Sequence, residues 1–202
     1  MEETKLSLSP EEWSIVADSE IILTKNAVLQ KIKTALEALS CWQLDFAREN
    51  TSRLPDLLFA NNGKISRGEN YKGLPYLVLD YPRHFRQGHI FAIRSMFWWG
   101  KQISVTLHLS GEWKDRFADR LTSRLEPLKN ETIYLCCSGD EWEHDVSGAG
   151  YISLQEPGNP PIQDLLRNSH FIKLAYANPV GQLEGAPEFW RNKFRELMEL
   201  VL

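Results

Sequence analysis

The side chains of this sequence that are best suited to chemistry are Asp80, Arg94 and His108. A carboxylate, a guanidinium and an imidazole on one surface can bind a polar or anionic ligand, or transfer protons. Arg94 would supply planar donors for a carboxylate or a phosphate, and His108 is the group expected to titrate near neutral pH. These roles require that neighbouring strands place all three side chains on one face.

The segment 89–109 predicts a β-hairpin: apolar and polar residues alternate in its second strand, and Phe91, Ile93 and Phe97 share one face of its first strand while Arg94 lies on the other. A three-residue loop at 99–101 brings the two apolar sets together. A two-residue turn would instead put Arg94 among apolar side chains, and a slip of one residue moves a whole set to the wrong face. We therefore predict that Arg94 lies opposite Thr106 and shares its face with His108.

The strand predicted at 76–81 adds Asp80 to this face if its leucines point into the core. Around the three polar groups we expect further side chains that complete a partly enclosed ligand pocket: Tyr76, Thr106 and Trp98. An internal ion pair that fixes the order of the strands is the alternative interpretation.

Three functions compete for this sequence. The first is binding of a small polar or anionic ligand in that pocket. The second is a protein–protein module, a homodimer included, that uses exposed tryptophans such as Trp98, Trp99 and Trp142. The third is an enzyme with an acid–base pair of His108 and Asp80, although no enzyme motif is present and no catalytic residue is assigned.

Composition narrows the class of protein. The chain has 202 residues, 43% of them hydrophobic, and a formal net charge of −4, which is typical of a globular domain and argues against a nucleic-acid partner. No apolar run is long enough to span a bilayer, and the acidic N-terminus lacks the apolar core of a signal peptide. Three cysteines without paired spacing favour a reducing, cytoplasmic compartment.

No metal or other cofactor is expected. The acidic segment 140–145 holds several carboxylates and His144, but Glu143, His144 and Asp145 are consecutive, and no second set of ligands has a recognised spacing.

Helix signals flank the central strands. Ser9 and Glu12 form a predicted capping box before a short helix, and a long helix with one apolar stripe is expected over about 21–48. Further helices are predicted at 112–125 and 162–168, and from Pro187 to the C-terminus. We expect strands at 132–137, 151–154 and 171–176, and loops at 66–73 and 82–88.

This order of elements predicts a single α+β domain over residues 1–202. Its antiparallel sheet would be covered on the apolar face by the long N-terminal helix and by further helices. In particular, we expect Phe91, Ile93 and Leu107 to pack against the long helix.

Two runs in the central region, GKISRGENYKGLPYLVLDYPRHF and FAIRSMFWWGKQISVTLHLSG, resemble a group of uncharacterised bacterial proteins of unknown function. The resemblance covers about Gly63 to Gly111, a quarter of the chain, and implies a bacterial protein without implying an activity.

Overall fold

The chain folds around one large sheet, in a computed structural model that describes residues 6–53, 55–125, 132–156 and 161–202. Its strands are β1 (Lys64–Tyr71), β2 (Leu74–Arg86), β3 (His89–Trp98), β4 (Gln102–Ser110), β5 (Tyr134–Cys136), β6 (Tyr151–Ser153) and β7 (Phe171–Pro179). Its α-helices are α1 (Pro10–Ala17), α2 (Ser19–Asn50), α3 (Glu112–Leu125), α4 (Ile162–Asn168) and α5 (Ala186–Val201). Short 3₁₀ helices follow α2 (Thr51–Arg53 and Asp56–Leu58) and β7 (Val180–Gly185).

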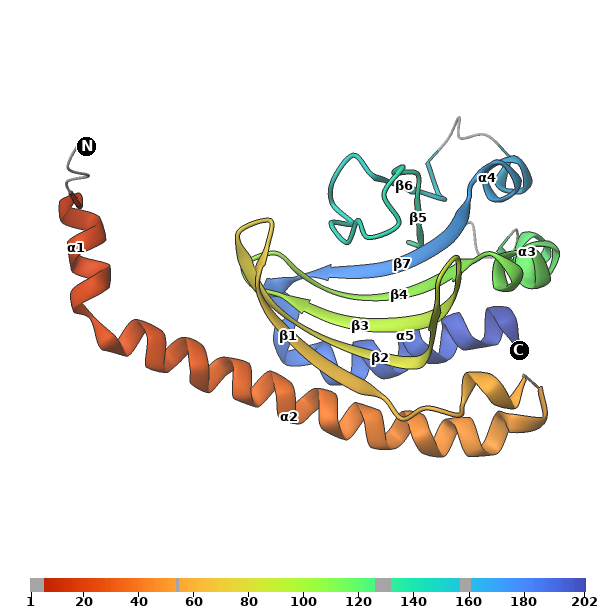
Figure 1. The fold of residues 1–202 in the computed structure, drawn as a ribbon, viewed down its shortest axis with the longest axis horizontal. Helices are drawn as coiled ribbons and strands as arrows, with labels where there is room; N and C mark the ends of the chain where they lie inside the picture. The colour runs from red at the N-terminus through yellow and green to blue at the C-terminus, as the bar shows by residue number, and fades with distance from the viewer. Residues whose placement is uncertain (1–5, 54, 126–131, 157–160) are drawn as a thin grey trace.

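The sheet of the described residues has seven strands in the order β1-β2-β3-β4-β7-β5-β6, and each strand is antiparallel to its neighbours. Helices α2 and α5 lie together on one side of the sheet, while the segment that contains β5 and β6 rises on the other side (Figure 1). The single-domain α+β fold that the sequence predicts is therefore confirmed.

The register of the central hairpin is also as predicted. Trp98 pairs with Gln102, so three residues form the loop, and Gly100 adopts φ +66° within it, a backbone conformation that side chains other than glycine disfavour. Arg94 lies opposite Thr106, and His108 lies opposite Ala92. Matching of the apolar faces thus decides the register of this hairpin.

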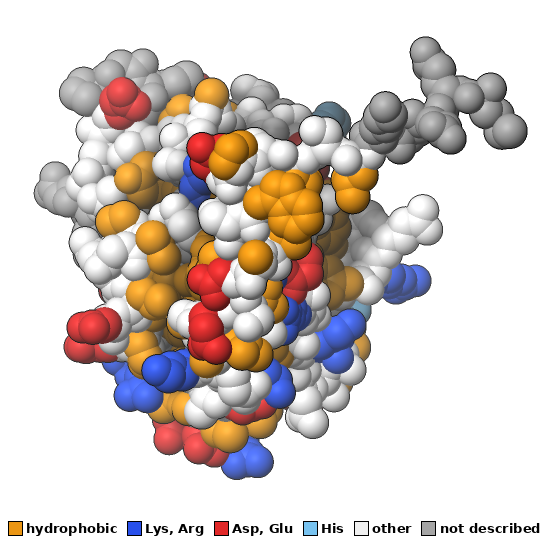
Figure 2. All heavy atoms as spheres, turned by 90° about the vertical axis from the view of Figure 1, so that its left-hand side faces the viewer, with side chains coloured by type: hydrophobic (Ala, Val, Ile, Leu, Met, Phe, Trp, Pro, Cys, Tyr) orange, Lys and Arg blue, Asp and Glu red, His pale blue; other side chains and the backbone are white. Residues whose placement is uncertain are grey.

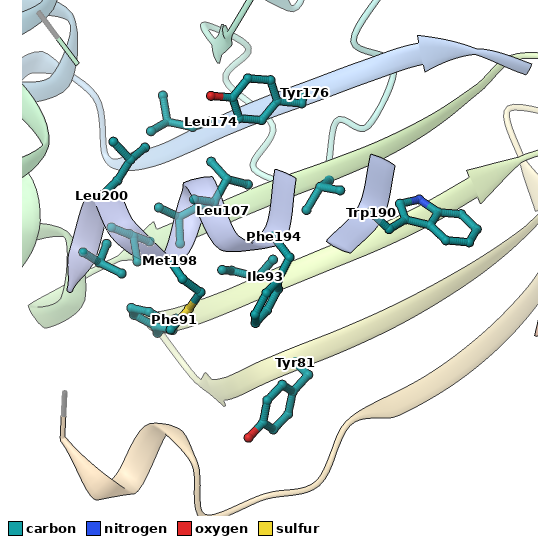
Figure 3. Packing of buried hydrophobic residues seen from close by; sticks show 14 of the residues in the cluster. Tyr81, Phe91, Ile93, Leu107, Leu174, Tyr176, Trp190, Phe194, Met198 and Leu200 are labelled. Atoms are coloured by element: carbon teal, nitrogen blue, oxygen red, sulfur yellow. The ribbon is translucent and has the colours of Figure 1, made fainter. Parts of the chain in front are cut away.

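The apolar face of the central strands is completely buried, with Phe91, Ile93 and Leu107 at 0% exposure. Figure 3 shows that side chains of α5, among them Phe194 and Met198, cover these strand residues. The prediction that α2 covers them is wrong, because α2 packs mainly on β1 and β2 and meets α5 along its side.

Two segments predicted as loops are strands. β1 occupies most of the segment 66–73, and β2 continues through the basic segment 82–88 as far as Arg86, so that only Gln87 and Gly88 form its turn. β1 is an edge strand whose residues are half-buried or exposed, and it therefore lacks the apolar alternation that identifies a strand in a sequence.

Candidate functional site

The polar face of the sheet carries the three side chains that the sequence places together. Asp80 pairs with Arg94 across β2 and β3, and Arg94 pairs with Thr106 across β3 and β4. His108 lies two residues further along β4 on the same face. The shared face is confirmed, whereas a role in ligand binding stays a prediction.

Arg94 is held by partners on its own chain. Its Nε and Nη2 donate to the two carboxylate oxygens of Asp80 at 2.7 and 2.9 Å, and its Nη1 lies 2.9 Å from Nε2 of His144. Asp80 is only 5% exposed, so this two-pronged ion pair is shielded from solvent. Arg94 therefore joins strand β2 to a segment that is distant in sequence.

That segment, residues 137–150, crosses the polar face, and we call it the cover segment. Lys173 on β7 anchors it from below, since its Nζ donates to the backbone oxygens of Glu141 at 2.9 Å and of Glu143 at 2.5 Å. The same Nζ lies 3.2 Å from Nδ1 of His144. Lys173 is 0% exposed, and a buried amine needs such partners to offset the loss of its hydration.

His144 receives contacts from two basic groups at once. A guanidinium can only donate, so Nε2 of His144 accepts from Arg94 and the proton of the neutral ring sits on Nδ1, facing Lys173. Nζ of Lys173 already donates to the backbone oxygens of Glu141 and Glu143, so its contact with Nδ1 of His144 is the longest of the three. Burial, followed by the charge of Arg94, lowers the pKa of Lys173 to about 8.

Burial and the charges of Lys173 and Arg94 also lower the pKa of His144 to about 2.

His108 differs from its expected role. Its Nε2 lies 3.2 Å from a carboxylate oxygen of Glu141, so its partner is not Asp80, and the predicted acid–base pair of His108 and Asp80 is wrong. Burial, with the charges of Lys173 and Arg94, lowers the pKa of His108 to about 3. These effects outweigh the attraction of the half-exposed Glu141 carboxylate, so His108 is neutral at pH 7 and donates to Glu141.

A second group of contacts holds the middle of the cover segment to the loop between β1 and β2. The Tyr71 hydroxyl donates to Glu143 at 2.7 Å, and Lys72 reaches both Glu143 and Asp145 at 3.0 and 3.3 Å. Burial raises the pKa of Glu143, but hydrogen bonds from the Asp145 amide, Tyr71 and Lys72 outweigh it and lower the pKa to about 2. The middle of the cover segment is thus held both by the sheet, through Arg94 and Lys173, and by Tyr71 and Lys72.

The cavity beneath the cover segment is small. It encloses about 10 Å³, room for about one water molecule, and its walls include Arg94, Thr106, His108, His144 and Lys173. Of the expected pocket residues, Arg94, His108 and Thr106 line it. Tyr76 and Trp98 do not, because they pack with Val78 and Met96 in a separate cluster near Tyr71.

A wider cleft of about 860 Å³ lies beside the cover segment, between it, α4 and the start of β7. Its described walls carry the carboxylates of Asp140, Glu141 and Asp164, and His170 is their only basic side chain. This charge pattern suits a cation better than the anion expected from the sequence. No group of three or more metal-ligating side chains is found in the described parts of the chain.

The other prominent feature is the N-terminal arm, which we define as residues 9–24. It comprises α1 and the first turns of α2, and it projects from the body of the molecule (Figure 1). Every residue of the arm is exposed, and the first buried residue of α2 is Leu29. Six large apolar side chains of the arm are between 43% and 67% exposed: Trp13, Ile15, Val16, Ile21, Ile22 and Leu23.

All charged residues of the arm are acidic. It contains Glu11, Glu12, Asp18 and Glu20 and no lysine or arginine. Figure 2, which shows the side from which the arm projects, has hydrophobic side chains beside acidic ones at its centre.

Of the three tryptophans predicted to form an interaction surface, only Trp142 is exposed to solvent. Trp98 is 1% exposed, and its indole N–H donates to the Tyr71 backbone oxygen at 3.2 Å, so its assignment to a surface is wrong. Trp99 is half-buried against Phe97. Trp142 is 44% exposed and lies near Phe85, and Trp13 on the arm is 60% exposed.

Two residues of the buried cluster were not predicted. Lys173 interrupts the apolar run of β7. A lysine in a buried strand is almost always paired, so its position indicates that a polar group contacts it in the interior. The sequence around His144 indicates only a possible metal ligand, because its contacts with Arg94 and Lys173 depend on the path of the cover segment.

Comparison with known proteins gives no relative: no protein-family model, no curated protein and no solved structure matches this chain. Among the described helices, none has both the length and the apolar character required to cross a membrane.

Proposed function

We propose that this protein is a docking module that binds another protein through its N-terminal arm. The observation that carries this proposal is the arm itself, in which six large apolar side chains stand in solvent. Clusters of exposed apolar side chains on a folded protein are typical of binding surfaces. The class of function is the second of the three expected from the sequence, but the residues that carry it differ from those expected.

The stability of α1 supports the proposal. α1 has eight residues and buries none of them. Helices shorter than about 12–15 residues are marginal in water unless tertiary contacts stabilise them. The capping box of Ser9 and Glu12 satisfies two N-terminal amides, at 3.2 and 2.7 Å, and contributes about 1 kcal/mol. A partner that covers Trp13 and Val16 would supply the missing contacts.

A bacterial, cytoplasmic setting is part of the proposal. Its supports are the resemblance over Gly63 to Gly111 and the three free thiols of Cys41, Cys136 and Cys137.

Photo-crosslinking in the producing cell tests the docking function. The full chain would carry p-benzoylphenylalanine in place of Trp13, and the matched control would carry it in place of exposed Phe85. We expect a discrete protein adduct from position 13 that disappears when Ile22→Glu is added. An adduct that survives Ile22→Glu, or no protein adduct at all, would refute the proposal.

A second candidate is the binding of a small anion by the basic side chains under the cover segment. The specific observation is the convergence of Arg94, His108 and Lys173 on one cavity. Since that cavity has room for about one water molecule, binding of a larger anion requires the cover segment to lift. Asp80 would then orient Arg94 through their ion pair.

Isothermal titration with inorganic phosphate tests this second candidate. Binding should weaken about tenfold in His108→Gln, which loses one direct contact worth about 1.4 kcal/mol, and persist in the control His170→Gln, whose side chain is exposed. Equal binding by both variants, or none by the native protein, excludes the candidate.

A further inference from the structure

The arm is followed directly by a stretch of the opposite charge. Residues 25–36 of α2 contain Lys25, Lys31 and Lys33 and no aspartate or glutamate, whereas the arm contains four carboxylates and no basic residue. The N-terminal region is therefore divided into an acidic apolar half that projects from the body and a basic half that packs on it.

A groove beside the basic half has a mixed lining of apolar and polar side chains. It encloses about 200 Å³ beside α2, β1 and β2, and it is lined by the half-buried Ile65, by Leu29 and Leu77, which are each 2% exposed, and by the polar Asn26 and Gln30. Lys33 and Arg67 lie at its rim. The groove thus combines the two properties that an acidic, apolar helix requires of a binding surface.

We infer that the partner of the arm is a second copy of this chain, bound in an antiparallel, two-fold arrangement. In it the arm of each copy lies along residues 25–36 and the neighbouring groove of the other copy. This inference rests on the proposed docking function and names the partner. A two-fold contact is self-complementary, so the same two surfaces are used twice.

Charge selects the antiparallel arrangement over a direct pairing of the two arms. Two arms side by side would bring four carboxylates against four carboxylates, which is repulsive. The antiparallel arrangement instead sets each acidic arm against Lys25, Lys31 and Lys33 of the other copy. The arm is not straight, because α1 ends at Ala17 and meets α2 at an angle (Figure 1), so the eight residues of α1 span about 12 Å of the basic stretch of about 18 Å.

The basic side chains have weak partners on their own chain. Lys25 and Arg67 both contact Glu69, at 2.8 and 2.5 Å, and Lys33 lies 3.3 Å from Glu37. These pairs are 25–50% exposed, and exposed ion pairs contribute about 0–1 kcal/mol each. They can therefore be shared with or exchanged for carboxylates of an incoming arm. The charged residues that line the groove, Lys33 and Arg67, are both basic, so its rim is positive.

Sedimentation equilibrium of the full chain, combined with charge exchange, tests the inference. The acid-exchange variant is Glu11→Lys with Glu20→Lys, and the base-exchange variant is Lys31→Glu with Lys33→Glu. These positions avoid Glu12 of the capping box and Lys25, which contacts Glu69. The control, Arg86→Glu with Arg116→Glu, alters two exposed charges, one at the end of β2 and one in α3, and α3 lies at the end of the sheet away from the arm (Figure 1).

We expect the native protein and the control to reach twice the mass of 23.3 kDa. Each exchange variant alone should dimerise at least about tenfold more weakly, the effect of about 1.4 kcal/mol lost from several ion pairs. An equimolar mixture of the two exchange variants should restore the dimer, because the reversed arm of one meets the reversed groove of the other.

Two results would overturn the inference: a native protein that is monomeric at all concentrations, or a dimer that tolerates both exchanges. A monomer that still gives the Ile22-dependent adduct at position 13 would remove the second copy as partner and keep the docking function. A monomer without that adduct would remove both.

Discussion

Mild acid should destabilise this protein through its two buried histidines. The folded pKa values of His108 and His144 are lowered to about 3 and about 2, from an ordinary value of 6.5. As pH falls below 6.5, His108 and His144 bind protons in the unfolded chain but stay neutral in the folded chain. The free energy of unfolding, which is highest above pH 6.5, therefore decreases. Each histidine changes the free energy of unfolding by up to about 1.4 kcal/mol per pH unit.

Between pH 6.5 and 5 the two groups together should cost about 3 kcal/mol. The histidines are 5% and 8% exposed, so solvent screening reduces this little. Glu143, whose pKa is also lowered, begins to contribute only near its ordinary value of 4.5 and does not interfere.

Urea unfolding at pH 6.5 and at pH 5 measures the loss of stability. Variants His108→Gln and His144→Gln keep a polar side chain and cannot titrate, so each should remove about half of the loss. The control is His170→Gln, because His170 is exposed. If the native free energy of unfolding does not change over this range, or if both variants show the full loss, the histidines are not buried in the neutral form and the reasoning fails.

Three further predictions concern the core, a turn and the thiols. Leu107→Ala should cost about 2–5 kcal/mol in urea unfolding, and Leu57→Ala, at a residue 52% exposed, less than about 1 kcal/mol; equal costs would contradict the packing of the core. Gly111→Ala should destabilise the protein by more than about 1 kcal/mol, because φ is +55° there and the added methyl group meets the Gly88 backbone oxygen; a neutral result would refute this geometry. Thiol titration of protein denatured without oxidants should count three free thiols, and a count of one would show a disulfide.

Periodicity explains why most of the fold was predictable. β4 alternates strictly, so only one register places Phe91, Ile93 and Phe97 of β3 on the same face as its apolar residues. Helices α3 and α4 begin and end at the predicted residues. β1 was not predicted because an edge strand with exposed residues needs no apolar alternation. The helix that covers β3 and β4 was misassigned because an apolar stripe shows that a helix packs, and does not show against what.

Only the part of the candidate site that depends on neighbouring residues in a strand could be predicted from the sequence. Alternation places Asp80, Arg94 and His108 on one face, since it depends on neighbouring residues alone. The ring of His144 and the carbonyl oxygens of the cover segment reach that face through a path that no local pattern determines. The interpretation of a polar face as an open pocket therefore missed the segment that closes it.

The contacts of the N-terminal arm could not be predicted from local sequence patterns either. A core helix and a docking helix have the same apolar period, so the period alone led to the expectation that the long N-terminal helix covers the sheet. The distribution of charge differs between the two. A helix that only covers a sheet has no need to separate acids from bases along its axis, whereas residues 9–24 hold only acids and residues 25–36 only bases. Separation of charge along an apolar helix is therefore the sequence signal that we connect with pairing between two copies.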